Sequence, residues 1–416
     1  MVEIDAPKFN LFAVGAFPPA LGGGERQGWT IARQLAKAGH SLTIFSQEIA
    51  GKEPPIAQNV RFVTFPTQRQ VDVSPKDFSL ARPISGYLNR HVAREPLRQA
   101  LMAEISRARP DAIIVNFGAP WASFVMPIAK KMGIPVITII HGSDAHALTR
   151  PEYRKTRKAV VRSYSKSDAK IAVADYLKST LDAMGVKNIE VIRNTIDAKK
   201  FGAIHPEKSG FWRKRFNIPK NATVFVHVSY LAPVKNPLLI VQAASLAVQK
   251  NPEMHFLIVG EGPLRQAMEK MVKTNGLSKK FTFTGEATHS QIRNYFSFSN
   301  VHIMSSLREG TPLVIMEAAA AGLPTIATRA GGIPEIVLDG HNGFLVEQEN
   351  AAQMAEKMLE ISDPKILKRM SRSSRQWANG MSIRKYRQRL NETIARTIEN
   401  AKAKKEKPRR FWQRKK

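Results

Sequence analysis

The sequence predicts an α/β protein built from two doubly wound parallel sheets. Short, almost continuously apolar runs alternate with helical stretches along most of the 416 residues, and such runs are typical of parallel strands covered by helices on both faces. The alternation stops in a polar stretch at residues 194–220 and then begins again. A chain of this length is sufficient for two domains of ordinary size.

The first half begins with a strand, a glycine loop, a helix and a second strand. The strand at residues 9–15 runs into Gly22-Gly23-Gly24-Glu25, a helix follows over 25–37, and the next strand covers 41–45. This order is typical of a βαβ unit. Further strands are expected at residues 112–116, 135–140, 169–173 and 189–192.

The second half repeats this design without a sequence repeat. Its strands are expected at residues 223–228, 254–260, 281–284, 301–304, 325–328 and 343–346, and its helices at 238–250, 264–275, 290–296 and 312–321. Residues 364–400 read as helical. We therefore predict an N-terminal domain over 1–200, a C-terminal domain over 201–380, a helix over 381–400 that packs back on the N-terminal domain, and a basic tail over 401–416.

Charge and cysteine content limit the function classes. The chain has no cysteine, which excludes disulfides and thiolate metal sites and fits a reducing compartment. No secretory signal and no apolar stretch long enough to span a bilayer are evident, so we expect a cytoplasmic protein. The net charge of +30 favours anionic lipid, nucleic acid or phosphorylated substrates as partners. Lys and Arg concentrate at residues 151–170 and 401–416, although such a charged tail can also be a solvated, disordered segment.

The most informative stretch places two glutamates around the start of a buried helix. Thr311 is an acceptable N-cap, and Pro312 fits the first helical turn. A buried helix N-terminus suits an anion such as phosphate. Glu309 precedes this end, and Glu317 lies inside the apolar helix, where a carboxylate needs a partner such as a sugar or ribose hydroxyl. The plainer interpretation is a solvated loop acid and a helix acid paired to a lysine.

Several motifs occur in a specific order. The most specific are Glu309-Gly310-Thr311-Pro312-Leu313-Val314-Ile315-Met316-Glu317, Gly331-Gly332-Ile333-Pro334-Glu335 and Gly340-His341-Asn342-Gly343. Weaker ones are Gly22-Gly23-Gly24-Glu25, His141-Gly142-Ser143-Asp144, Asn194-Thr195-Ile196-Asp197, Pro233-Val234-Lys235-Asn236 and Gly260-Glu261-Gly262-Pro263. With these motifs the chain resembles glycosyltransferase family 4, the retaining, sugar-nucleotide-dependent transferases of the GT-B fold, from Phe9 to Val346.

The resemblance implies two Rossmann-like domains that face each other across a cleft, the N-terminal one on the acceptor side and the C-terminal one binding the nucleotide sugar. It implies three catalytic residues. Glu309 would hold hydroxyls of the donor sugar, and His141 would contact that sugar from the N-terminal domain. Lys235 would neutralise the diphosphate leaving group, where charge develops in the transition state. Taken alone, His141 could equally be a buried structural histidine and Lys235 a surface lysine.

The resemblance also implies a set of donor-binding residues, with Glu317 on the ribose hydroxyls. The full set is Glu317, Gly310, Thr311, Pro312, Leu313, Val314, Gly23, Gly24 and Asp144. One departure concerns an arginine that the family often has shortly before the motif lysine, because residues 228–233 contain none. Arg308 and Arg265 are the candidates to replace it.

The expected activity is transfer of a sugar from a UDP- or GDP-sugar to a hydroxyl of a lipid-linked or cell-envelope glycan, with retention and without a covalent nucleophile. No bound cofactor and no essential metal are expected, since no Asp-x-Asp motif occurs. The basic surface suggests an enzyme peripheral to the cytoplasmic face of the membrane. Alternatives are another GT-B enzyme, such as a sugar-nucleotide epimerase or a phosphorylase, and a nucleic-acid-binding protein. No nucleic-acid-binding motif is evident, so no specific nucleic-acid partner is expected.

Overall fold

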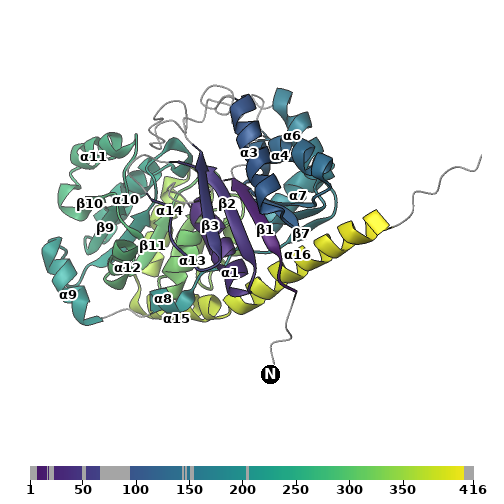
Figure 1. Cartoon of the computed structure of the whole chain (residues 1–416). Helices are drawn as coiled ribbons and strands as arrows, with labels where there is room; N and C mark the ends of the chain where they lie inside the picture. Colours follow the sequence, from purple (N-terminus) through teal and green to yellow (C-terminus); the bar gives the residue numbers. More distant parts are fainter. Residues whose placement is uncertain are drawn as a thin grey trace, which may run out of the picture.

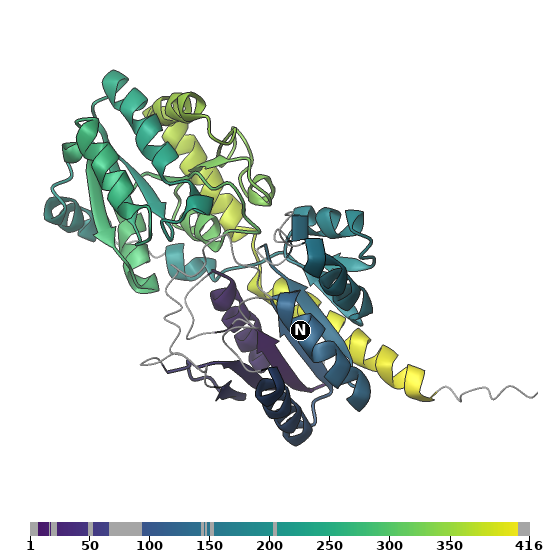
Figure 2. The same cartoon turned by 90° about the horizontal axis from the view of Figure 1, so that it is seen from above.

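The structure is a computed structural model that describes residues 7–15, 17, 23–48, 53–65, 94–142, 145, 148–149, 154–202 and 206–406. Within these ranges the chain forms two parallel sheets, each covered by helices. The two sheets lie in separate lobes, which are most easily distinguished from above (Figure 2). We call them the N-terminal and C-terminal lobes.

The N-terminal lobe contains a seven-stranded sheet of order β3-β2-β1-β4-β5-β6-β7 (Figure 1). Its strands are β1 (Asn10–Gly15), β2 (Ser41–Gln47), β3 (Val60–Phe65), β4 (Ala112–Asn116), β5 (Val136–Ile140), β6 (Ala169–Ala172) and β7 (Ile189–Val191). Its helices are α1 (Gly23–Lys37), α3 (Arg94–Ala108), α4 (Gly118–Met132), α6 (Arg154–Lys166) and α7 (Asp175–Ala183).

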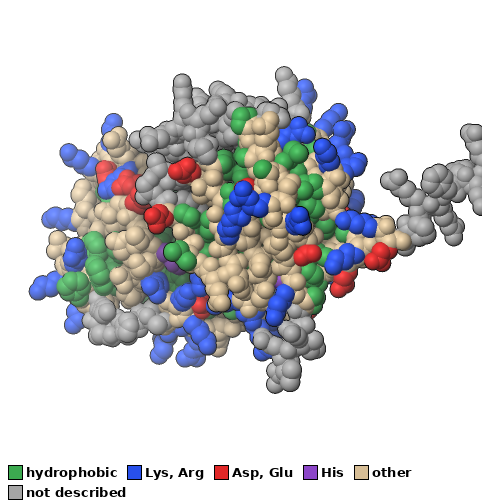
Figure 3. All heavy atoms as spheres, viewed as in Figure 1, with side chains coloured by type: hydrophobic (Ala, Val, Ile, Leu, Met, Phe, Trp, Pro, Cys, Tyr) green, Lys and Arg blue, Asp and Glu red, His purple; other side chains and the backbone are tan. Residues whose placement is uncertain are grey.

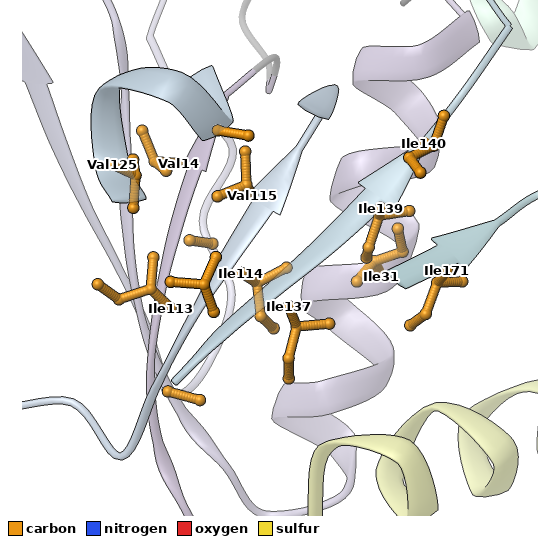
Figure 4. Close-up of a cluster of buried hydrophobic side chains, with 14 of the residues drawn as sticks. Val14, Ile31, Ile113, Ile114, Val115, Val125, Ile137, Ile139, Ile140 and Ile171 are labelled. Atoms are coloured by element: carbon orange, nitrogen blue, oxygen red, sulfur yellow. The ribbon is translucent and has the colours of Figure 1, made fainter. Parts of the chain in front are cut away.

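Branched aliphatic side chains explain why the central strands of this sheet form. Every residue of β4 and β5 is buried, and isoleucines and valines from both strands point into the core (Figure 4). Such side chains are stiff and pack well on a pleated surface. Because both faces are covered, the strands are apolar throughout rather than alternating.

The C-terminal lobe contains a six-stranded sheet of order β10-β9-β8-β11-β12-β13. Its strands are β8 (Thr223–Val228), β9 (Met254–Val259), β10 (Phe281–Gly285), β11 (Val301–Met304), β12 (Thr325–Thr328) and β13 (Gly343–Val346). Its helices are α8 (Ala198–Gly202), α9 (Pro206–Arg215), α10 (Leu238–Lys250), α11 (Arg265–Thr274), α12 (His289–Ser297), α13 (Leu313–Ala320), α14 (Ala351–Ile361) and α15 (Pro364–Asn379), with short turns η3 (Pro233–Lys235), η4 (Ser278–Lys280) and η5 (Ile333–Glu335).

The last helix, α16 (Ile383–Glu406), returns to the N-terminal lobe. It runs along that lobe in both views (Figures 1 and 2). Four of its residues belong to the buried cluster of the first sheet, and their spacing of four places them on one helix face: Tyr386, Leu390, Ile394 and Ile398. The domain boundaries near residues 200 and 380 remain predictions.

The helical stretch expected at residues 364–400 consists of two helices, because the chain leaves the C-terminal lobe after Asn379 and begins α16 at Ile383 on the other lobe. Strand β3 was not expected. At the edge of the sheet, all of its residues except Phe65 are half-buried or exposed, so the strand lacks the continuous apolar signal of the inner strands. None of the helices in the described ranges combines the length and apolar character needed to cross a membrane.

Candidate active site

Glu309 and Lys235 form an ion pair at the carboxyl end of the second sheet. Lys235 ends the turn η3 after β8, and Glu309 lies in the loop between β11 and α13. The Lys235 Nζ lies 2.5 Å from Glu309 Oε1, and Ser306 Oγ donates to the same oxygen at 2.8 Å. Glu309 is 9% exposed, so the first of the two glutamates is not a solvated loop acid. The pair lies in the loops that follow β8 and β11, with the Lys235 side chain half-buried and that of Glu309 almost fully buried.

Glycines let the loop that carries Glu309 contact both its own lobe and the other one. A Cβ atom on Gly142 would lie 2.5 Å from the backbone nitrogen of Gly310, and a Cβ atom on Gly331 would lie 1.9 Å from the backbone carbonyl oxygen of Glu309. Both distances are too short for real Cβ contacts. The lobes therefore meet backbone to backbone between Gly142, just after β5, and Gly310.

Glu317 is buried inside α13 and has arginine and histidine partners rather than a lysine. Its side chain is 3% exposed. Oε1 accepts from Arg26 Nη1 at 3.2 Å and from His289 Nε2 at 2.9 Å. Oε2 is buried and accepts no hydrogen bond from any residue that the structure describes. A buried carboxylate oxygen without a donor is costly, so it is a natural acceptor for a ligand hydroxyl.

The start of α13 differs from the prediction. Pro312 occupies the N-cap position with φ −70° and ψ 114°, and no side chain caps the helix. Leu313 and Val314 are therefore the first two helical residues. Thr311 is not the cap, because its hydroxyl donates to the Val173 carbonyl of the N-terminal lobe at 2.9 Å. The Thr311 hydroxyl, which was expected to cap α13, instead forms a hydrogen bond between the two lobes.

His141 lies directly after β5 and is almost fully buried. Its Nε2 lies 2.8 Å from Asn116 Oδ1. An amide oxygen only accepts, so Nε2 carries the proton and Nδ1 is an acceptor. Burial lowers the pKa of His141 to about 3, which keeps the ring neutral at physiological pH. His141 can therefore orient a hydroxyl but cannot supply a positive charge.

Phe117 is a residue of this region that the sequence analysis missed. Its ring stacks on His141 with centroids 4.6 Å apart, and it has φ +63°, which is unusual for a bulky residue and typical of a constrained functional position. A Cβ atom on Gly24 would lie 1.9 Å from the Phe117 ring. Gly24 thus makes room for Phe117, whereas a Cβ atom on Gly23 would meet nothing within 4 Å. Asp144 lies outside the described residues.

Neither candidate for the missing arginine forms an ion pair with Glu309 or Glu317. Arg265 pairs with Glu261 and, at 2.9 Å, with Glu269, and Arg308 is exposed. Among the described residues, Arg26, from the first turn of α1, contacts Glu317. Its position directly after Glu25 was visible in the sequence, but its pairing with Glu317, 291 residues away, was not.

Within the described ranges, no group of three or more His, Asp or Glu side chains could hold a metal ion. The site consists instead of two glutamates, each paired with a cation, beside the first residues of a buried helix. Such an arrangement can bind hydroxyl groups and stabilise negative charge that develops on a leaving group.

Two family models cover most of the chain. The family described as Glycosyltransferase Family 4 matches residues 21–200, and the one described as Glycosyl transferases group 1 matches residues 208–377. The chain belongs to the GT4-type glycosyltransferases. The two matches meet between the two sheets, so each lobe of this glycosyltransferase corresponds to one family.

Curated relatives of this glycosyltransferase act on several kinds of substrate. N-acetyl-alpha-D-glucosaminyl L-malate synthase of Bacillus anthracis is 24% identical over 86% of this chain and 89% of that protein. UDP-Gal:alpha-D-GlcNAc-diphosphoundecaprenol alpha-1,3-galactosyltransferase of Escherichia coli is 34% identical over 47% of this chain and 51% of that protein.

Solved structures support the GT-B fold. Anabaena HepE in complex with UDP superposes with a TM-score of 0.73 at 18% identity, over 93% of this chain and 99% of HepE. Sucrose-phosphate synthase from Thermosynechococcus elongatus gives a TM-score of 0.77 at 17% identity, over 94% of this chain and 99% of that protein. The fold of this glycosyltransferase is therefore an α/β GT-B fold with two Rossmann-like domains, as the sequence predicted.

Proposed function

We propose that this glycosyltransferase moves a sugar, with retained configuration, from a UDP- or GDP-sugar to a hydroxyl of a lipid-linked or cell-envelope glycan. The observation that carries the proposal is the buried Glu317 carboxylate, whose Oε2 has no donor among the described residues. A ribose hydroxyl would satisfy it. The name of the E. coli relative, with a UDP-sugar and a diphosphoundecaprenol-linked sugar, supports a nucleotide-sugar donor and a lipid-linked acceptor here.

The proposed reaction assigns a role to each group. The bond between the anomeric carbon and the diphosphate oxygen breaks, and the acceptor oxygen bonds to that carbon on the same face. The acceptor proton moves to the departing phosphate oxygen. Lys235 stabilises the charge on the diphosphate, Glu309 holds donor hydroxyls, and neutral His141 accepts from a sugar hydroxyl. Gly23, Gly310, Leu313 and Val314 contribute backbone close to the diphosphate.

Donor binding tests the proposal. We expect one sugar nucleotide from a UDP- and GDP-sugar panel to raise the melting temperature, because a ligand at a hundredfold its Kd stabilises the native state by about 2.7 kcal/mol. Glu317→Ala should abolish the shift. Glu399→Ala, an exposed acid on α16, is the control and should retain it. If Glu317→Ala keeps the shift, or if no donor binds the wild type, the assignment fails.

Activity tests the role of Glu309. Glu309→Gln keeps the shape of the side chain but removes its charge and its ion pair with Lys235. We expect transfer to fall by about 10²–10³-fold, the usual loss for one preorganised group in an active site. Full transfer activity in this variant would contradict the role.

We also propose that the enzyme docks on anionic membranes through α6. Exposed cations recur every four residues on this helix, at Arg154, Lys158, Arg162 and Lys166, and α6 contains no acid. Tyr164 on the same helix is fully buried, so the helix offers lipid its charges rather than an apolar face. One face of the molecule shows many more Lys and Arg than Asp and Glu side chains (Figure 3). The expected contribution is about 1 kcal/mol for each cation at the surface.

Vesicle binding tests the docking proposal. Sedimentation with vesicles containing anionic lipid should weaken as salt rises, because surface charges are screened. Replacing Arg154, Lys158 and Arg162 with Gln should weaken binding strongly. The matched control replaces Lys270, Lys273 and Lys279, three exposed lysines of the C-terminal lobe, with Gln. Equal losses in the two triple variants would show that net charge, and not α6, governs binding.

A further inference from the structure

Arg26 connects the two lobes at the residue proposed to bind the ribose. It lies in the first turn of α1, in the N-terminal lobe, next to Gly23 and Gly24. Its Nη1 donates to Glu317 Oε1 of the C-terminal lobe at 3.2 Å. The Arg26 side chain is 36% exposed, whereas that of Glu317 is 3% exposed. The guanidinium thus reaches from the N-terminal end of α1 to a buried acid in the other lobe.

The contact leaves hydrogen-bonding capacity on both partners. A guanidinium has five N–H donors in a fixed fork, and only Nη1 contacts Glu317. On the acid, Arg26 and His289 both use Oε1, and the buried Oε2 accepts from no described residue. A ribose hydroxyl can therefore bind Oε2 while Arg26 stays on Oε1, and the remaining donors of Arg26 can bind a second group of the same ligand.

The charges of the site indicate which group that is. Lys235 is already paired with Glu309 at 2.5 Å, and Arg26 is paired with Glu317. These four groups sum to zero net charge, whereas a nucleoside diphosphate brings at least two negative charges. Lys235, which is already paired with Glu309, is by itself a weak counter-charge for a diphosphate. Guanidinium forks match phosphate oxygens in a bidentate manner.

We propose that Arg26 binds the diphosphate of the donor from the N-terminal lobe while it holds Glu317, and so supplies the second cation beside Lys235. The proposal rests on the proposed function, because it presumes a nucleoside diphosphate donor. It gives Arg26 the place of the arginine that residues 228–233 lack. Since Arg26 and Glu317 belong to different lobes, a donor that binds both also holds the lobes together.

The test compares ligands that differ only in phosphate. Calorimetric titration with UDP, UMP and uridine, and with GDP, GMP and guanosine, identifies the base that the wild type binds. We expect Arg26→Ala to weaken binding of the nucleoside diphosphate by about 10- to 100-fold, which corresponds to the loss of one hydrogen bond to a charged group. Binding of the nucleoside should weaken by less than about threefold. Arg26→Lys, which keeps the charge but loses the fork, should fall between Arg26→Ala and the wild type.

Two outcomes would overturn the proposal. If Arg26→Ala loses the same affinity for the nucleoside and for the nucleoside diphosphate, Arg26 only positions Glu317. If its affinity for the nucleoside diphosphate is unchanged, Arg26 does not contact the diphosphate. Arg33→Ala, on the same helix about 10 Å further along its axis, is the control and should bind both ligands like the wild type. If the wild type itself binds no nucleotide, the proposed function fails, which is a different result.

Discussion

Gly142 and Gly310 are the residues at which the backbones of the two lobes touch. A Cβ atom on Gly142 would lie 2.5 Å from the nitrogen and 2.6 Å from the Cα atom of Gly310. Neither residue has a left-handed φ, so the glycines are required by space rather than by conformation. Because Gly310 follows Glu309 and Gly142 follows His141, this contact sets the separation of two proposed catalytic residues.

The first prediction concerns Gly142→Ala. The added methyl group must push the lobes apart by about an ångström, and misplacement on that scale costs about 100-fold in rate. We expect kcat/KM to fall by at least about tenfold with little change in the free energy of unfolding, measured by steady-state kinetics and urea denaturation. Gly210→Ala in α9, where a Cβ atom would meet nothing within 4 Å, should leave kcat/KM unchanged. Wild-type kinetics for Gly142→Ala would show that the contact is not needed.

At the scale of elements, a glutamate of one lobe caps a helix of the other. Helix α7 has Ala174 at its N-cap and no side-chain cap of its own. Glu335, in the turn η5, accepts from the backbone nitrogens of Asp175 at 3.0 Å and Tyr176 at 2.8 Å. Arg193 Nε also donates to it, at 3.4 Å. The free backbone N–H groups at the start of α7 thus donate to a carboxylate from the C-terminal lobe.

The second prediction concerns Glu335→Ala. Loss of the cap should cost about 1 kcal/mol and should speed hydrogen exchange at the amides of Asp175 and Tyr176. The matched control is Asp363→Ala, because Asp363 caps α15 in its own lobe through Lys365 and Ile366. That variant should lose similar stability without affecting α7. Unchanged exchange at Asp175 and Tyr176 in Glu335→Ala would mean that the cap does not form in solution.

At the scale of the whole molecule, four of the buried histidines make the free energy of unfolding depend on pH. Burial lowers the pKa of His141 and His302 to about 3, and that of His227 and His255 to about 4. The ordinary pKa of each histidine is 6.5. Between pH 6.5 and the lowered pKa of the folded protein, the unfolded chain therefore binds more protons than the native one. The stability from neutral histidines is therefore complete above pH 6.5 and is lost as pH falls toward the native values.

The third prediction follows from that sign. Below about pH 6, each of the four histidines should lower the free energy of unfolding by about 1.4 kcal/mol per pH unit, which urea denaturation at several pH values measures. His302→Asn should reduce this pH dependence by the contribution of one proton. A slope that His302→Asn leaves intact would contradict the burial argument.

The sequence was a good guide wherever a signal is local. Apolar runs predicted the bounds of the inner strands within one or two residues, because a strand buried on both faces is apolar throughout and can be recognised from its own sequence. It was a poor guide at contacts between distant parts of the chain. The sequence predicted that Thr311 caps α13, but its hydroxyl binds the Val173 carbonyl of the other lobe. Nothing in the sequence indicated that Arg26 pairs with Glu317. Strand β3 was missed because its half-buried edge residues carry a weak pattern.

The return of α16 has a consequence for how the protein is made. Tyr386, Leu390, Ile394 and Ile398 complete the buried cluster of the first sheet, so the first sheet to emerge from the ribosome lacks part of its core until α16 has been translated. The C-terminal lobe, translated later, has all its strands in one continuous segment from Thr223 to Val346 and can finish folding first. We therefore expect the C-terminal lobe to complete its core before the N-terminal lobe does.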